Sequence, residues 1–172
     1  MTPEAFQLPF EEVRFRATDG VWLSGWKIVT SPQAPWIIAC HGLGANRADV
    51  LEIAAAMARE GYNLLLFDFR AHGTSQGRAT SFGWLEQRDL EGALAFLGRQ
   101  PEAQDRPYGF FGISMGGAVG IMVAARDERL GAVACQRRLS IPSTLPAGPV
   151  ACISEGYGWR GSTPLFPVGL LF

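Results

Sequence analysis

The pentapeptide Gly-Ile-Ser-Met-Gly at residues 112–116 has the residue types and spacing of a turn that presents a nucleophile. It follows an apolar run that predicts a strand over residues 108–111, and it leads into a helical pattern that begins near Met115. A serine on so sharp a turn holds its hydroxyl above the sheet, and glycines remove side chains that would collide with the strand and the helix. The N-terminus of the helix also favours developing negative charge. The pattern predicts Ser114 as a nucleophile, whereas a turn that only packs closely would not need serine at its centre.

The elements that must position this serine alternate between strand and helix patterns. Short runs that are apolar on both faces predict buried parallel strands over residues 36–40, 63–67, 108–111 and 130–134. Helical patterns between them cover residues 48–60, 81–99 and 115–126. The first helix has Asn46 as a capping residue and Gly61 just past its end.

The chain begins with a predicted β-hairpin. Residues 11–16 and 21–28 are extended runs, and an Asp-Gly pair at residues 19–20 lies in the turn between them. Together with the alternating pattern, this predicts an α/β fold with a mostly parallel sheet, helices on both faces and an N-terminal hairpin.

Three motifs in order resemble the α/β-hydrolase superfamily. His-Gly-Leu-Gly at residues 41–44 follows the first predicted parallel strand, Asp-Phe-Arg-Ala-His-Gly-Thr-Ser-Gln-Gly at residues 68–77 follows the next, and Gly-Ile-Ser-Met-Gly-Gly at residues 112–117 follows the third. The resemblance covers roughly residues 10–134. It is greatest to the bacterial branch that includes serine aminopeptidase-like hydrolases, monoglyceride lipases and related esterases.

The resemblance implies hydrolysis of an ester, thioester or amide by acyl transfer through Ser114. In such a fold two backbone N–H groups hold the oxyanion, and by resemblance they belong to Leu43 and Met115. No cofactor and no metal are implied, and the expected partner is a small-molecule or acyl substrate.

The two histidines of the sequence, His41 and His72, are not expected to act as the general base. In the family that the chain resembles, the order is serine, then acid, then histidine, and both histidines here precede Ser114. We predict loop-shaping, hydrogen-bonding roles for them, and we expect Asp68 and Arg70 to brace the same loop.

A dinucleotide-binding fingerprint is the competing interpretation. Gly42 and Gly44 follow a predicted strand and precede a helix, and Asp68 ends the next strand. Arg47 stands where the third glycine of that fingerprint belongs, so close helix packing over a pyrophosphate is not supported.

After Ala134 the sequence changes character. No clear strand or helix period is seen there, and Asp, Lys and His are absent, with Glu155 as its one acid. The triad acid and histidine cannot be identified in this chain, because Asp127 lies at a helix end and Glu155 has no histidine to orient. We therefore divide the chain into residues 1–134, the N-terminal part of a hydrolase domain, and a divergent tail, residues 135–172.

The composition of the tail favours a frameshifted or otherwise non-native ending, and a real but divergent tail that completes its site with a partner chain is the milder alternative. Without the missing part, the chain is expected to expose the edge of its last strand, to be poorly soluble and to show little or no turnover. The non-enzyme alternative is an inactive fragment or pseudo-hydrolase.

The composition limits the other function classes. The net charge of −1 and 18% charged residues do not suggest a nucleic-acid footprint. No signal peptide or membrane span is recognised, so a cytoplasmic location is expected. The three cysteines are an odd number without metal-ligand spacing, which favours reduced thiols. The oligomeric state and the substrate cannot be predicted.

Overall fold

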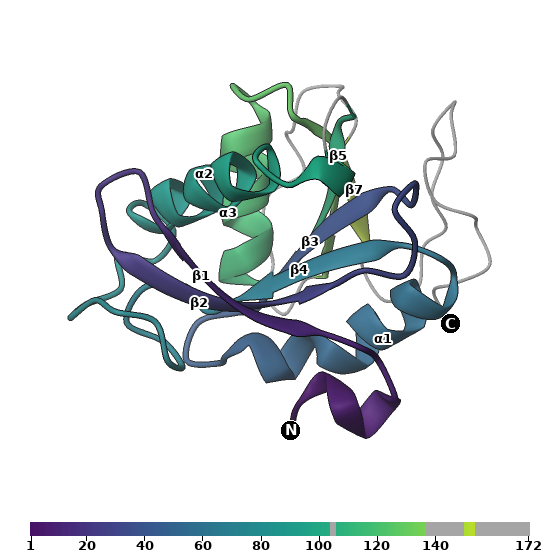
Figure 1. Cartoon of the computed structure of the whole chain (residues 1–172). Coiled ribbons are helices and arrows are strands. Elements are labelled where there is room, and N and C mark those ends of the chain that lie inside the picture. Colours follow the sequence, from purple (N-terminus) through teal and green to yellow (C-terminus); the bar gives the residue numbers. More distant parts are fainter. Residues whose placement is uncertain (104–105, 137–149, 154–172) are drawn as a thin grey trace.

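The computed structural model of the chain describes residues 1–103, 106–136 and 150–153. These residues form a mixed sheet of seven strands in the order β1-β2-β4-β3-β5-β6-β7 (Figure 1). The strands are β1 (Glu11–Arg16), β2 (Trp22–Ile28), β3 (Trp36–Cys40), β4 (Asn63–Phe67), β5 (Tyr108–Ile113), β6 (Leu130–Gln136) and β7 (Val150–Ile153). β1 and β2 are the predicted antiparallel hairpin, and β4, β3, β5, β6 and β7 run parallel to one another.

The register of the parallel strands brings three sequence motifs to one edge of the sheet. Cys40, the last residue of β3, is aligned with Phe67 at the end of β4 and with Gly112 near the end of β5. The residues that follow these strand ends, His41, Asp68 and Ser114, therefore lie along the same carboxyl edge. Open parallel sheets bind their ligands at this edge.

Helices cover both faces of the sheet, as predicted. α2 (Glu86–Leu97) and α3 (Met115–Ala124) lie on one face and α1 (Leu51–Arg59) lies on the other (Figure 1). β4 shows why both faces are buried, because its residues alternate: Leu65 packs with the α2 and α3 side, and Leu64 packs with the α1 side. Three short 3₁₀ turns complete the described elements: η1 (Pro3–Phe6), η2 (Arg47–Val50) and η3 (Pro101–Ala103).

The first predicted helix is confirmed in position, with a tighter first turn. The turn η2 precedes α1, and the Asn46 side chain accepts a hydrogen bond of 2.9 Å from the backbone N–H of Ala48. The carboxylate of Asp49 accepts one from the backbone N–H of Asn46, which completes a reciprocal cap. Gly61 follows the helix with a φ of +87°, a conformation that favours glycine.

The second predicted helix begins at Glu86 and not at Ser81. The Glu86 carboxylate is fully buried and accepts hydrogen bonds from the backbone N–H groups of Ser81 and Gly83. Phe82 and Gly83 both have a positive φ, so residues 81–85 form a turn, which the hydrogen bonds to the buried Glu86 carboxylate stabilise.

The expectation that no strand follows Ala134 is wrong. β6 continues to Gln136, and β7 (Val150–Ile153) pairs with it, so that Val133 is aligned with Val150. The edge of β6 that the sequence predicted to be exposed is therefore covered by β7. A run of four residues is too short to show a period, which is why the sequence did not reveal it. The rest of the predicted tail, including Glu155, lies outside the described residues, and its frameshifted origin stays a prediction.

Within the described part of the chain, no helix combines the length and the apolar character needed to cross a membrane.

Candidate active site

Ser114 lies at the junction of β5 and α3 in a strained backbone conformation. Its φ is 51° and its ψ is −112°, a backbone conformation that residues other than glycine rarely adopt. Two backbone hydrogen bonds fix the turn: the N–H of Ser114 donates to the carbonyl of Gln136 at 3.0 Å, and its carbonyl accepts from Ala118 at 3.1 Å. The side chain makes no capping hydrogen bond to α3, so the hydroxyl is not consumed by the helix that it begins.

Three glycines allow this turn because a side chain at any of them would collide with neighbouring atoms. A Cβ on Gly112 would lie 2.5 Å from the carbonyl carbon of Gly116. One on Gly116 would lie 2.6 Å from the carbonyl oxygen of His41, and one on Gly117 would lie 2.6 Å from Cβ of Cys135. α3 therefore packs directly on β5, on the end of β3 and on β6.

The loop after β3 lies against the same turn. A Cβ on Gly42 would lie 3.4 Å from Cβ of Ser114 and 3.3 Å from the carbonyl oxygen of Ile113. The next residue, Leu43, is 45% exposed, whereas Met115 on the other side of the serine is 7% exposed. Leu43 and Met115, the residues assigned by resemblance to the oxyanion hole, thus directly follow Gly42 and Ser114, which approach each other at the turn. Their role as donors to the oxyanion stays a proposal.

His41 connects the β3 loop to the β4 loop. Its Nδ1–H donates to the carbonyl of Gly42 at 2.7 Å, and its Nε2 accepts from the backbone N–H of Phe69 at 3.1 Å. The ring is fully buried, and desolvation lowers the pKa of this histidine, so the neutral form is favoured. This pattern requires the tautomer protonated at Nδ1.

His72 makes the same kind of bridge. Its Nδ1–H donates to the carbonyl of Arg70 at 2.8 Å, and its Nε2 accepts from the backbone N–H of Gly44 at 3.1 Å. The predicted hydrogen-bonding roles of both histidines are confirmed. Because both ring nitrogens of each histidine are already engaged, neither ring has a free lone pair for the Ser114 hydroxyl.

Asp68 and Arg70 brace the β4 loop, as predicted. The Asp68 carboxylate accepts hydrogen bonds from the backbone N–H groups of Arg47 at 2.7 Å and Thr74 at 2.9 Å. The Arg47 side chain forms an ion pair with the same carboxylate and lies over the ring of Trp26, 4.5 Å from its centroid. This network also weakens the dinucleotide interpretation, because the acid that would bind a ribose is occupied by the chain itself.

Arg70 joins two acids that the sequence did not single out. Its guanidinium donates to Asp89 at 2.9 and 2.7 Å and to Asp19 at 2.8 and 2.9 Å. The hydrogen bond from Arg70 lowers the pKa of Asp19 to about 2, whereas burial raises the pKa of Asp89 to about 6 against the opposing effect of Arg70. Only its full burial in the fold distinguishes Asp89 from a surface acid of the same helix.

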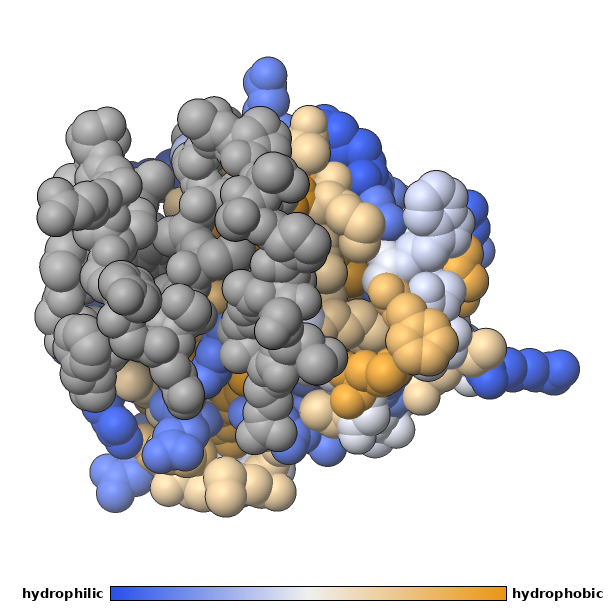
Figure 2. All heavy atoms as spheres, turned by 180° about the vertical axis from the view of Figure 1, so that it is seen from behind, coloured by the Kyte–Doolittle hydropathy of each residue, from blue (hydrophilic) through white to orange (hydrophobic). Residues whose placement is uncertain are grey.

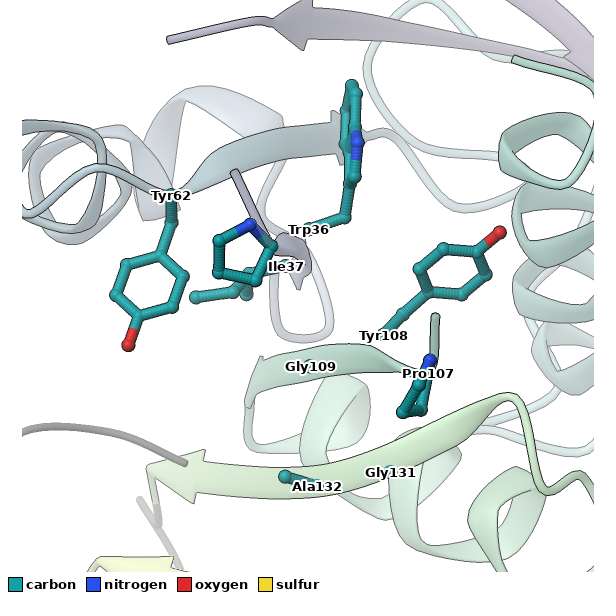
Figure 3. Close-up of a pocket in the computed structure, with 9 residues that line it drawn as sticks. Trp36, Ile37, Tyr62, Pro107, Tyr108, Gly109, Gly131 and Ala132 are labelled. Carbon is teal, nitrogen blue, oxygen red and sulfur yellow. The ribbon is translucent and has the colours of Figure 1, made fainter. Parts of the chain in front are cut away.

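A small cavity lies at the opposite edge of the sheet and is not part of this site. Trp36, Tyr108 and Gly131 line it, at or next to the first residues of β3, β5 and β6 (Figure 3). Its volume of about 40 Å³ holds little more than one water molecule. The length of β5, about 20 Å at about 3.3 Å per residue, separates this cavity from Ser114. The side chains of Trp36 and Tyr108 donate hydrogen bonds to carbonyls of the η3 turn, which indicates that these two residues have a structural role.

Large apolar side chains are exposed on two loops. Leu43 is 45% exposed, Phe82 is 74% exposed and Trp84 is 73% exposed. In Figure 2, which shows the molecule from behind, hydrophobic atoms reach the surface among hydrophilic ones. Among the described residues there is no cluster of three or more histidine, cysteine or acidic side chains suited to a metal ion.

Residues 35–143 match the model of a family described as the alpha/beta hydrolase fold. Polyketide transferase ATR5 of Stachybotrys chlorohalonatus is 30% identical over 126 residues, which cover 72% of this chain and 42% of that protein. Thiohydrolase aneE of Aspergillus aculeatus is 31% identical over 133 residues, which cover 76% of this chain and 42% of that protein.

Among solved structures, the esterase Pf2001 of Pyrococcus furiosus superposes with a TM-score of 0.74 at 31% identity, covering 79% of this chain and 55% of that one. The alpha/beta hydrolase GrgF of Penicillium superposes with a TM-score of 0.70 at 27% identity, covering 75% of this chain and 46% of that one. The chain thus spans about half the length of the relatives it matches. With this fold, these motifs and this family match, the chain belongs to the alpha/beta hydrolase family.

Proposed function

We propose that the protein is a serine hydrolase that transfers the acyl group of an ester, thioester or amide to Ser114. The observation that carries this proposal is the conformation of Ser114, with a φ of 51° between β5 and α3. Strain of this kind persists where the surrounding structure enforces it, and it often accompanies function. Here it projects a hydroxyl at the carboxyl edge of the sheet, where a substrate can reach it.

The backbone N–H groups of Leu43 and Met115 are the proposed donors to the oxyanion. The close approach of Gly42 to Ser114 supports this, because the β3 loop then lies beside the serine that would attack the acyl carbon of the substrate. Fixed donors aimed at the developing charge need no reorganisation during the reaction, and each is worth about 2.7 to 4 kcal/mol.

The bond that is cleaved is proposed to be an ester or thioester in the first instance. Similar proteins bear the names esterase and thiohydrolase, which supports both. The proposed substrate is a small molecule or carries an acyl group, and no cofactor takes part. The proposal also includes a cytoplasmic location and no nucleic-acid partner.

Turnover by these 172 residues alone is proposed to be slow. A serine hydroxyl is a weak nucleophile at neutral pH without a general base, and both histidines of the chain have their ring nitrogens engaged in loop hydrogen bonds. The same observation favours the second candidate, a non-catalytic fragment or pseudo-hydrolase.

A fluorophosphonate probe separates the two candidates. The probe labels a serine whose hydroxyl attacks phosphorus, with the oxyanion donors stabilising the charge that develops. Slow labelling of the wild type that is lost in Ser114→Ala supports the proposed hydrolase. Equal labelling of both proteins contradicts the assignment of Ser114, and no labelling of a folded wild type favours the pseudo-hydrolase.

A further inference from the structure

Most charged side chains at the carboxyl edge of the sheet are neutralised within the protein. Arg47 pairs with Asp68, and Arg70 pairs with Asp19 and Asp89. Arg88 also pairs with Asp19, so that three arginines face three carboxylates and their charges balance. Arg78 differs, because it is exposed and makes no ion pair with any residue that the structure describes.

Arg78 lies at the border of an open hollow. One wall of the hollow is the β3 loop, residues 43–46, and the other is formed by residues 71–73 and 78–80. Its volume of about 550 Å³ is within the range of about 300 to 1,000 Å³ that is common for small-molecule sites. Among the described lining residues, Arg78 is the sole arginine, and none of them is a lysine, aspartate or glutamate.

The hollow adjoins Leu43 and Met115, the two proposed donors to the oxyanion. Leu43 is part of its wall. Thr80 on the facing wall has its hydroxyl oxygen 3.7 Å from Sδ of Met115. The same hydroxyl donates to the buried carboxylate of Glu86 at 2.9 Å, which holds this wall in place. A ligand in the hollow would therefore lie next to the residues whose N–H groups are proposed to bind the oxyanion.

We propose that this hollow binds an anionic group of the acyl substrate, a carboxylate or a phosphate, with the Arg78 guanidinium as its ion-pair partner. The inference rests on the proposed function, because it assumes that the substrate is attacked at Ser114. The guanidinium fork suits both anions. The described lining residues include no carboxylate, and Leu43 offers apolar contact to the chain between the anion and the acyl carbon.

The test measures binding in the Ser114→Ala protein, so that no acyl transfer takes place. The ligands are para-nitrophenyl hemisuccinate for the carboxylate, butyryl phosphate for the phosphate, and neutral para-nitrophenyl butyrate. Each is titrated by NMR into the full chain with Arg78 present, with Arg78→Gln, and with Arg59→Gln. Arg59 is the matched control, because it is an exposed arginine at the end of α1 with the same charge.

The proposal predicts that Arg78→Gln raises the Kd of at least one anionic ligand about five- to tenfold, which is about 1 to 1.4 kcal/mol for a partly exposed pair. The Kd of the neutral ester and all values for Arg59→Gln should stay unchanged. Added salt should weaken binding of the anion only. The carboxylate and phosphate titrations show which anion is preferred.

An unchanged Kd of both anions in Arg78→Gln overturns the proposal, as does an equal loss for the neutral ester or for Arg59→Gln. These results are independent of the fluorophosphonate experiment, because Ser114 is absent. Failure of labelling refutes acyl transfer, whereas failure of the titration refutes the anion site alone.

Discussion

Replacing Ser114 by glycine should make the protein more stable than replacing it by alanine. Serine and alanine both carry a Cβ, and both are strained at a φ of 51° and a ψ of −112°. Glycine has no Cβ and adopts positive φ values at little cost. The comparison of glycine with alanine therefore isolates the backbone strain, because both variants lack the hydroxyl.

The size of the difference follows from two opposing terms. A residue held in a sparsely populated backbone region costs about 1 to 3 kcal/mol, which glycine recovers. Glycine also loses more conformational entropy on folding, which removes about 0.4 to 1 kcal/mol of that gain. The net expectation is about 1 kcal/mol in favour of Ser114→Gly, or about 2 to 4 °C in Tm for a chain of this size.

Urea denaturation followed by circular dichroism measures this difference, with equal m values as a check on two-state behaviour. Ala118→Gly in the interior of α3 is the control, and it should cost about 1 kcal/mol because the backbone there is helical. A Ser114→Gly protein that is no more stable than Ser114→Ala would refute the strained turn, and with it the main observation behind the proposed nucleophile.

Three further predictions concern the surroundings of the turn. Gly116→Ala should cost about 1 to 3 kcal/mol of stability and reduce fluorophosphonate labelling, because its Cβ would lie 2.6 Å from the carbonyl oxygen of His41. Gly98→Ala is the control in urea melts, and it should be tolerated because Gly98 has a helical φ of −60° and its Cβ would lie 3.4 Å from the nearest atom. His72→Gln should keep the labelling rate within about threefold if the ring only bridges loops, and a loss of about 100-fold or more would instead identify it as a base. Asp19→Asn should lower stability at pH 7 by about 1 kcal/mol after allowance for solvent screening. Because the pKa of Asp19 is lowered from 3.8 to about 2, its stabilising effect is complete above pH 3.8 and is lost as the pH falls through 2, so the two urea midpoints should converge there; a constant gap would contradict the ion pair.

The strand-turn-helix around Ser114 could be predicted from sequence because each of its requirements is local. Glycines at residues 112, 116 and 117 mark close contacts that leave no room for a side chain, and the apolar run before them marks a buried strand. The hairpin was predictable for the same reason, since its turn is formed by neighbouring residues.

The features that the sequence did not reveal depend on distant residues or on very short segments. Arg70 lies 51 residues from Asp19 and 19 residues from Asp89, so no spacing rule connects them. The late start of α2 depends on the Glu86 carboxylate turning back to Ser81 and Gly83, an arrangement that competes with the helical pattern. β7 has four residues and is defined by its pairing with β6.

The most direct test of the central claim is to look for an acyl group on Ser114 after incubation with para-nitrophenyl acetate. Peptide mapping by mass spectrometry locates the acetyl group, and Ser114→Ala is the control. We predict that acetylation forms slowly on Ser114 and persists, because deacylation also needs a general base and neither histidine of the chain has a free ring nitrogen. Acetylation at other residues only, or to the same extent in Ser114→Ala, would contradict the claim that Ser114 accepts the acyl group.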